Sequence, residues 1–253
     1  GVFPLSWTLD HCGPLSRSVE DAALTMQVIA GYDPLDPASI DLPVPDFSAG
    51  LGQDLAGLRI AYARRFFIDN PALTEPALKA LDATAERMAA LGAVVEEIDL
   101  PPFEAYSACQ QALMFGEAYA YHEQNLKTRP QAYGRYAYQH LASGAVLSAA
   151  DMVQAQRLRR ELTTDLNARV FGAFDAMLAP NTLDTAAPFA SFGKDVGRWV
   201  GVMTGPFNVT GHPALALPVG LAPNGLPLSV QIVGRPFDEA GVLRIGAALE
   251  AVF

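Results

Sequence analysis

The chain has 253 residues, of which 51% are hydrophobic and 17% are charged. A chain of this length buries roughly three quarters of the surface that its unfolded state exposes, so we expect a globular enzyme-sized core. Acidic residues outnumber basic ones by 27 to 17, with a formal net charge of −10 and no basic run, so we expect no direct binding to nucleic acid. No apolar run spans a membrane, and two cysteines, Cys12 and Cys109, favour a reducing cytoplasm over a disulfide scaffold.

The first predicted element is a helix that begins after Ser18. Ser18 and Asp21 have the spacing of a capping box, with Asp in place of the usual Glu or Gln. Apolar residues then recur on one face as far as Ile29, and Gly31 can take the left-handed position that ends a helix. A mostly polar loop with Asp-Pro pairs follows through residue 52.

A strand, a helix and a second strand come next. Residues 58–63 predict a short strand, residues 74–92 a helix with apolar side chains at helical spacing, and residues 94–98 another strand. Short links between such elements favour a right-handed βαβ unit with two parallel strands.

The rest of the chain continues the alternation. In chain order we expect helices over 104–125 and 149–171, the second capped by Ser148 and Asp151, a buried strand over 175–180, a helix near 196–208, strands over 214–218 and 229–233, and a last helix from Asp238. The sequence therefore predicts an α/β fold with a mixed β-sheet core covered by helices. No linker divides the chain, so residues 1–253 are treated as one unit.

Two stretches, read together, resemble the amidase signature hydrolases. The first is residues 4–23, PLSWTLDHCGPLSRSVEDAA; the second is residues 206–234, with PFNVTGHPA, LPVG, GLP and QIVG in the family's order. The resemblance implies hydrolysis of carboxylic amides through an acyl-serine intermediate. In that family the nucleophilic serine, a bridging serine and the activating lysine lie upstream of the first stretch. The resemblance thus implies that residues 1–253 are the C-terminal part of a single amidase-like domain that is incomplete at its N-terminus.

The chain itself offers no complete catalytic centre, so we assign no catalytic residue. Its lysines are Lys79, Lys127 and Lys194; the first two fall in polar, solvated positions. Ser191 and Lys194 have the S-x-x-K spacing, but Gly193 argues against the helix which that motif requires. No histidine pair has metal-ligand spacing, and no glycine-rich phosphate loop is present, so we expect no metal and no cofactor.

Five residues of the two stretches are expected to support the site structurally. Asp10, Arg17 and Asp21 match charged positions of the family's first motif, where a buried or half-buried network of ion pairs and caps is expected. Asn208 precedes the turn Gly211-His212-Pro213 and can bond its own backbone there. Gln231 lies inside a strand and is expected to satisfy buried backbone groups.

Two groups of residues are candidates for the substrate pocket. Gln139 and His140 stand where tRNA-dependent amidotransferase A subunits carry an arginine for the carboxylate of glutamine, so the resemblance to those subunits is weaker here. Trp199, Met203 and Phe207 recur at four-residue spacing on one helical face. Such a face is more often core than pocket, although its place just before the second motif favours the pocket.

The expected partners are a small-molecule amide, the upstream segment of the same protein and, as a further option, a second copy of the chain. A strand over the apolar residues 1–7 would pack against the upstream segment. Two alternatives stay open: the A subunit of a tRNA-dependent glutamine amidotransferase, and a non-catalytic amidase-like binding module. Without the upstream segment, this chain alone is expected to be inactive.

Overall fold

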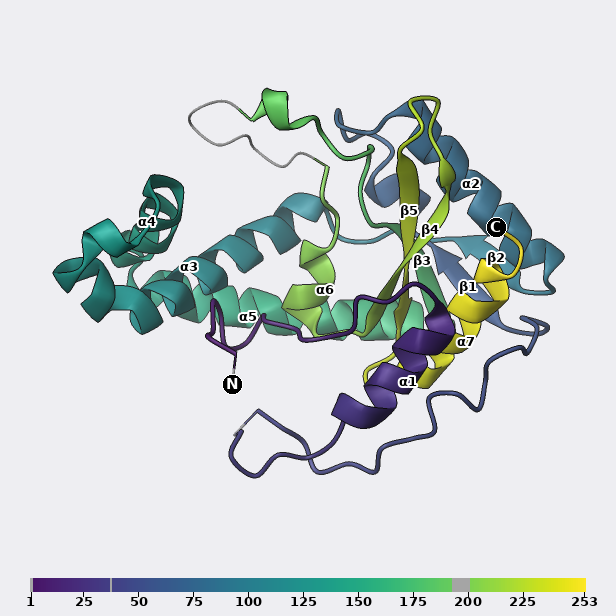
Figure 1. Ribbon diagram of the computed structural model, residues 1–253, viewed down its shortest axis with the longest axis horizontal. Helices are drawn as coiled ribbons and strands as arrows, with labels where there is room; N and C mark the ends of the chain where they lie inside the picture. The colour runs from purple at the N-terminus through teal and green to yellow at the C-terminus, as the bar shows by residue number, and fades with distance from the viewer. Residues whose placement is uncertain (1, 37, 193–200) are drawn as a thin grey trace.

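A five-stranded mixed sheet with helices packed on both faces forms the centre of the molecule (Figure 1). The computed structural model describes residues 2–36, 38–192 and 201–253. The strands are β1 (Arg59–Tyr62), β2 (Val94–Glu97), β3 (Ala176–Pro180), β4 (Ala214–Leu221) and β5 (Pro227–Gly234), in the sheet order β2-β1-β3-β5-β4. The predicted α/β class is confirmed.

The parallel half of the sheet is the predicted strand-helix-strand unit. β1 pairs in parallel with β2, from Arg59 opposite Val94, and in parallel with β3 on its other side. β5 is antiparallel to both β3 and β4, and the β4–β5 ladder shifts register between Pro218 and Leu221. The two halves make one mixed sheet with β2 and β4 at its edges.

The helices are α1 (Val19–Ile29), α2 (Glu75–Ala90), α3 (Phe103–Thr128), α4 (Arg135–Ala142), α5 (Ala149–Leu166), α6 (Gly205–Thr210) and α7 (Glu239–Glu250). Two predicted starts are confirmed: Ser18 accepts a hydrogen bond from the Asp21 amide, and Ser148 and Asp151 form a reciprocal capping box. α5 runs directly into a π-helical turn, Asn167–Phe171.

Successive side chains of a strand point to opposite faces of the sheet. Each face of this sheet packs against its own apolar cluster. Ile60 and Leu178 face one apolar cluster, which α1, α2 and α7 complete. Ala61 and Met177 face a second cluster, which the π-helical turn and Phe207 complete. Burying each large side chain in these clusters stabilises the fold by about 1.5–3 kcal/mol.

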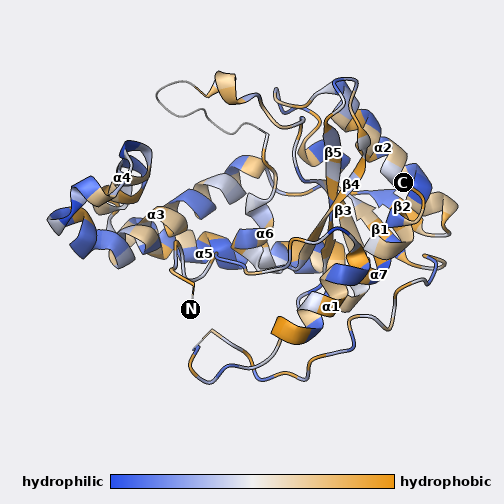
Figure 2. Cartoon of the chain, viewed as in Figure 1, coloured by the Kyte–Doolittle hydropathy of each residue, from blue (hydrophilic) through white to orange (hydrophobic). Residues whose placement is uncertain are grey.

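The long helices α3 and α5 extend away from the sheet side by side, and α4 lies near their far end (Figure 1). Apolar side chains between them, among them Tyr106, Cys109 and Leu113 of α3 and Leu162 of α5, form a third cluster. Much of α5 is hydrophilic in Figure 2, as its many charged residues require. None of the helices in the described ranges is long and apolar enough to cross a membrane.

The predicted helix near 196–208 is confirmed over residues 205–208 and is wrong over residues 201–204. Gly201 has a positive φ of 76°, and Val202 forms a β-bridge with Thr182, so residues 201–204 do not continue a helix. α6 begins only at Gly205, with Pro206 in its first turn. Residues 193–200, which include Lys194 and Trp199, lie outside the described part of the chain.

Candidate functional site

The two motif stretches, almost two hundred residues apart in the chain, meet against α3 and α5. Leu9 of the first stretch and Val209 of the second are only 4% and 0% exposed, and both belong to the apolar cluster between the two helices. The folded chain therefore brings together the segments that the sequence singled out separately.

Residues 5–10 form a tight turn. The Asp10 carboxylate accepts the backbone amides of Leu5 and Ser6 at 2.8 and 3.1 Å, and the amides of Leu9 and Asp10 return to the Ser6 carbonyl at 3.1 and 2.9 Å. The strand expected near the start of the chain is therefore absent from the described residues 2–7, because Asp10 folds the backbone back on itself.

Glu117 of α3 holds one side of this turn. Its Oε2 accepts the Ser6 hydroxyl at 2.7 Å and the Thr8 amide at 3.0 Å, and its Oε1 accepts the Thr8 hydroxyl at 2.6 Å. Ser6 is only 1% exposed. A carboxylate accepts three hydrogen bonds here, and bonds to a charged acceptor are stronger than bonds between neutral groups.

Arg159 of α5 holds the other side and joins the two stretches. Its Nη2 donates to the Thr8 carbonyl at 2.7 Å, and its Nε donates to the Val209 carbonyl at 2.7 Å. Asn208 adds a third link, because its Nδ2 donates to the Leu9 carbonyl at 2.9 Å. The expectation that Asn208 bonds its own backbone is therefore wrong: its amide reaches across to the first stretch.

We call the set Ser6, Thr8, Leu9, Glu117, Arg159, Asn208 and Val209 the motif junction. Sequence reasoning missed Glu117 and Arg159. Glu117 lies 109 positions from Thr8 and Arg159 lies 151 positions from it. No local pattern connects residues at such separations, so only the fold reveals them.

His212 follows the junction and is buried at 2% exposure. Its Nδ1 lies 2.9 Å from the Thr210 hydroxyl, its Nε2 lies 3.4 Å from Asn167 Oδ1, and its ring stacks on Phe171. Burial lowers the pKa of His212 to about 4. The imidazole is neutral at neutral pH, and its contacts tie the end of α6 to the π-helical turn.

Gln231 lies on β5 at 2% exposure. Its Nε2 donates to the carbonyls of Pro180 and Met203, at 2.7 and 3.1 Å. Pro180 ends β3 and Met203 lies just before α6. Gln231 thus satisfies buried backbone groups next to the second stretch.

Of the side-chain contacts in the buried or half-buried network of ion pairs and caps expected for Asp10, Arg17 and Asp21, only the bonds from backbone amides to Asp10 are formed within the described ranges. All three residues are exposed, and among the described residues no ion pair joins Arg17 to either aspartate. The start of α1 is held instead by Glu250 of α7, whose two carboxylate oxygens lie 3.2 Å from the Val19 amide. Arg17 and Glu250 line a depression of about 360 Å³ beside the β4 edge.

The pocket candidates lie in different parts of the molecule. Gln139 is exposed on α4, and His140 packs against Tyr136 with its Nδ1 3.0 Å from the Tyr136 carbonyl. Met203 and Phe207 are 2% and 4% exposed and belong to separate apolar clusters. Because Met203 precedes α6, these two do not share one helical face, and Trp199 is among the residues that the structure leaves undescribed.

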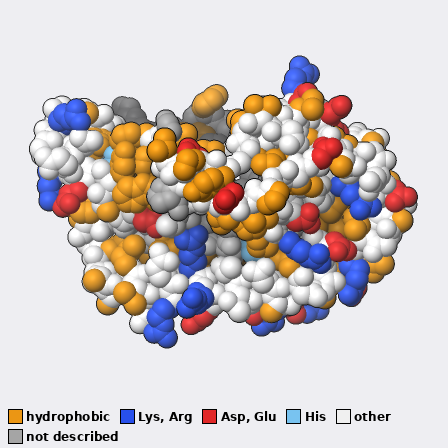
Figure 3. All heavy atoms as spheres, turned by 90° about the horizontal axis from the view of Figure 1, so that it is seen from below, with side chains coloured by type: hydrophobic (Ala, Val, Ile, Leu, Met, Phe, Trp, Pro, Cys, Tyr) orange, Lys and Arg blue, Asp and Glu red, His pale blue; other side chains and the backbone are white. Residues whose placement is uncertain are grey.

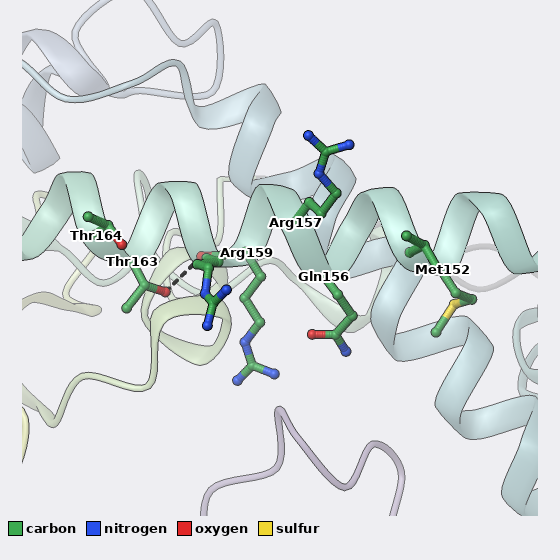
Figure 4. Close-up of a pocket in the computed structure, with 8 residues that line it drawn as sticks. Met152, Gln156, Arg157, Arg159, Thr163 and Thr164 are labelled. Carbon is green, nitrogen blue, oxygen red and sulfur yellow. Dashed lines mark hydrogen bonds between the residues drawn. The ribbon is translucent and has the colours of Figure 1, made fainter.

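A larger depression, about 720 Å³, runs along α5 beside the motif junction (Figure 4). It is lined by Met152, Val153, Gln156, Arg157, Arg159, Arg160, Thr163 and Thr164. Arg159 and Gln156 point toward the N-terminal segment, whereas Arg157 points away from it (Figure 4). Its lining includes neither Gln139 and His140 nor Met203 and Phe207.

The described lysines have ordinary surface partners. Lys79 pairs with Glu75 and Lys127 with Glu123, each at 2.6 Å, and their side chains are 74% and 61% exposed. The Ser191 hydroxyl donates to the Pro188 carbonyl at 2.7 Å. Within the described ranges, no group of three or more candidate ligands could hold a metal ion.

The amidase family model matches residues 1–243 of the chain. The chain belongs to the amidase signature family. It is 37% identical over 262 residues to an amidase from Pseudomonas putida, covering 99% of this chain and 54% of that protein. It is 33% identical over 278 residues to the glutamyl-tRNA(Gln) amidotransferase A subunit from Chloroflexus aggregans, covering 100% of this chain and 56% of that protein.

Solved amidase structures have the same fold. A chain from the inhibitor-bound structure of a vestigial protein complex, which reveals the evolutionary origins of an s-triazine catabolic enzyme, superposes with a TM-score of 0.89 at 30% identity, over 100% of this chain and 55% of that chain. Peptide amidase from Stenotrophomonas maltophilia superposes with a TM-score of 0.80 at 26% identity, over 100% of this chain and 55% of that chain. The chain spans about half the length of the relatives it matches.

Proposed function

We propose that these 253 residues are the C-terminal part of a single amidase domain that hydrolyses carboxylic amides through an acyl-serine intermediate. The nucleophilic serine, the bridging serine and the activating lysine then come from residues outside this sequence, and the chain alone is inactive. The observation that carries the proposal is the family match over residues 1–243 in a chain about half as long as its relatives. The two free cysteines, Cys12 and Cys109, support a cytoplasmic location.

The state of the lysines supports the inactivity of the chain alone. A lysine that draws a proton from a serine must be neutral at working pH, and that requires removal from water. Lys79 and Lys127 are exposed and paired with carboxylates, an environment that favours the charged form. Neither suits the role of an activating base.

Ammonia release from benzamide or propionamide tests this proposal. The purified chain should release none, and Lys194→Ala should leave any background rate unchanged because the Ser191 and Lys194 spacing is coincidental. Steady ammonia release that a single serine substitution within the chain abolishes would overturn the proposal.

The amide specificity is proposed to favour neutral over acidic substrates. Gln139 and His140 cannot form the bidentate clamp that an arginine offers a carboxylate. In a form of the protein that hydrolyses amides, uncharged aliphatic or aromatic amides should have the higher kcat/KM. A tenfold or greater preference for glutamine or asparagine would contradict this.

The alternative with specific support is the A subunit of an amidotransferase, because the relative of that kind from Chloroflexus aggregans is 33% identical over the whole chain. That alternative predicts a protein partner and glutamine hydrolysis. A stable, specific complex formed by the chain without any amidase activity would instead favour a non-catalytic binding module.

A further inference from the structure

Thr8 is the residue of the motif junction that side chains of both α3 and α5 bind directly. Its amide and hydroxyl donate to Glu117 at 3.0 and 2.6 Å, and its carbonyl accepts from Arg159 at 2.7 Å. All of its polar groups are therefore bound to side chains of two helices, although Thr8 is itself exposed. The polar groups of an exposed loop residue ordinarily bond to water. Because those of Thr8 bond to protein side chains instead, the backbone at Thr8 is held in one position.

The two helices that supply these side chains pack firmly against each other. Gly116, next to Glu117 on α3, leaves room for the Met152 side chain of α5, which a larger residue there would displace. Leu113 and Leu162, at 0% and 4% exposure, fill the space between the helices. Glu117 and Arg159 therefore stand in a fixed relation, since packed interiors deform little.

The chemistry of Glu117 and Arg159 also suits them to hold the first motif segment from two sides. We call this pair of side chains the clamp. Carboxylate Oε1 and Oε2 of Glu117 accept three donors, and the planar fork of Arg159 serves two carbonyls with Nε and Nη2. A lysine has one nitrogen at the end of a flexible chain and cannot reproduce two separate donors in one plane.

We propose that Glu117 and Arg159 are positioning residues of the amidase: together they fix the first motif segment against the second, and so place the catalytic residues that precede that segment. This inference rests on the proposed function for its catalytic consequence. Reacting groups held by such a segment are sensitive to small displacements, and a shift of about 1 Å can slow a reaction by about a hundredfold.

Trp7 reports directly on the clamp because it lies between the two clamped residues, Ser6 and Thr8. Its ring meets Tyr121 of α3 edge-on, with centroids 5.3 Å apart, and it is 56% exposed. In a Trp199→Phe background, Trp7 is the one remaining tryptophan of the chain. Glu117→Gln and Arg159→Lys should each lower the fluorescence anisotropy of Trp7 and accelerate hydrogen exchange at the Thr8 amide by tenfold or more.

Matched controls lie on the same two helices. Glu123→Gln removes a carboxylate of α3 that bonds Lys127 and Tyr119, and Arg157→Lys changes an arginine of α5 that points away from the N-terminal segment. Both should leave Trp7 and the Thr8 amide unchanged. If Glu117→Gln fails to fold, Thr8→Val, which removes one hydroxyl donor, gives the same readout with a smaller effect.

The catalytic arm uses the form of the protein that hydrolyses amides. Glu117→Gln and Arg159→Lys should lower kcat by about tenfold to a hundredfold and leave KM within a factor of two. A Trp7 signal that does not move would overturn the clamp. A Trp7 signal that moves while kcat stays at the wild-type value would overturn the positioning role. If no form hydrolyses amides, the proposed function fails, while the Trp7 measurement still decides the clamp.

Discussion

His212 shows how one buried side chain makes the stability of the molecule depend on pH. Its pKa is about 4 in the folded chain because burial disfavours the charged imidazolium, whereas an unfolded chain has a histidine pKa near 6.5. Between these two values the unfolded state binds more protons than the folded state. Stability therefore falls as the pH is lowered through this window.

The expected loss is about 3 kcal/mol between pH 6.5 and 4, the free energy that corresponds to this lowering of the pKa. Urea unfolding at several pH values measures it. His212→Gln should flatten the pH dependence in this window, because it removes the buried imidazole. An unchanged slope in His212→Gln would show that other groups cause it.

At the scale of single residues, the sequence identified what local patterns encode. Ser18 and Ser148 act within a few positions of themselves, and the sequence placed both of them at helix caps. Glu117 and Arg159 act on backbone more than a hundred positions away. Such a contact depends on how two helices pack, and it cannot be predicted from composition or from the spacing of residues in the sequence.

Among the elements, α1 and α5 have related but unequal N-terminal caps. Ser148 and Asp151 bond each other's backbone in both directions, whereas Ser18 accepts one bond from the Asp21 amide and Glu250 serves the Val19 amide. Each cap satisfies amides that the first helical turn leaves free. The reciprocal pair Ser148 and Asp151 should therefore stabilise α5 more than Ser18 stabilises α1.

Ser148→Ala should lower the free energy of unfolding by about 1–2 kcal/mol and Ser18→Ala by about 0.5–1 kcal/mol. Chemical denaturation of the two variants under one set of conditions tests the order. A larger loss in Ser18→Ala would mean that Glu250 does not compensate at α1. An equal loss would mean that the reciprocal bond of Asp151 contributes nothing.

At the scale of elements, long stretches with a regular apolar pattern predicted helices and strands correctly. The spacing of a few isolated apolar residues predicted a helix over residues 201–204, where none forms. The βαβ unit formed as expected: β1 pairs in parallel with β2, and apolar residues of α2 pack on the cluster that covers one face of the sheet. The helical spacing of Met203 and Phe207 was coincidental, since Gly201 and the bridge at Val202 break the helix. α4 went unpredicted because Leu141 is its one buried residue and gives no apolar face.

At the scale of the whole molecule, the apolar N-terminal segment is poorly covered. Val2, Phe3, Leu5 and Trp7 are 72%, 63%, 45% and 56% exposed. Apolar side chains also show among charged ones over the face that Figure 3 presents, and Leu24, Val28 and Leu35 add to the exposed large hydrophobics. Several large apolar side chains exposed within one short segment, as in residues 2–7, favour association.

The chain alone should therefore self-associate and be marginally stable, and a variant with Val2→Ser and Phe3→Ser should associate less. Leu35→Ser, at a residue 90% exposed in a different loop, is the matched control. Sedimentation velocity over a hundredfold range of concentration measures the effect. A monodisperse monomer that melts above about 60 °C would contradict this expectation and favour a self-sufficient module.

The family could be predicted from the two motif stretches because their order and spacing are specific, and the meeting of those stretches at Glu117 and Arg159 now gives them a shared physical role. The choice of substrate-pocket residues stays a prediction. These residues were chosen by their position within a resemblance, and in the fold Gln139 is exposed on α4 whereas Met203 is buried just before α6.

The central claim is that the acyl-forming serine lies outside these 253 residues. A fluorophosphonate forms a stable covalent bond with an activated serine, so intact-mass measurement of the treated chain tests the claim without reference to any particular amide. We expect no adduct on the purified, folded chain. A stoichiometric adduct on one serine of the folded chain would contradict the claim, provided that it does not form when the chain is unfolded before treatment or when that serine is replaced by alanine.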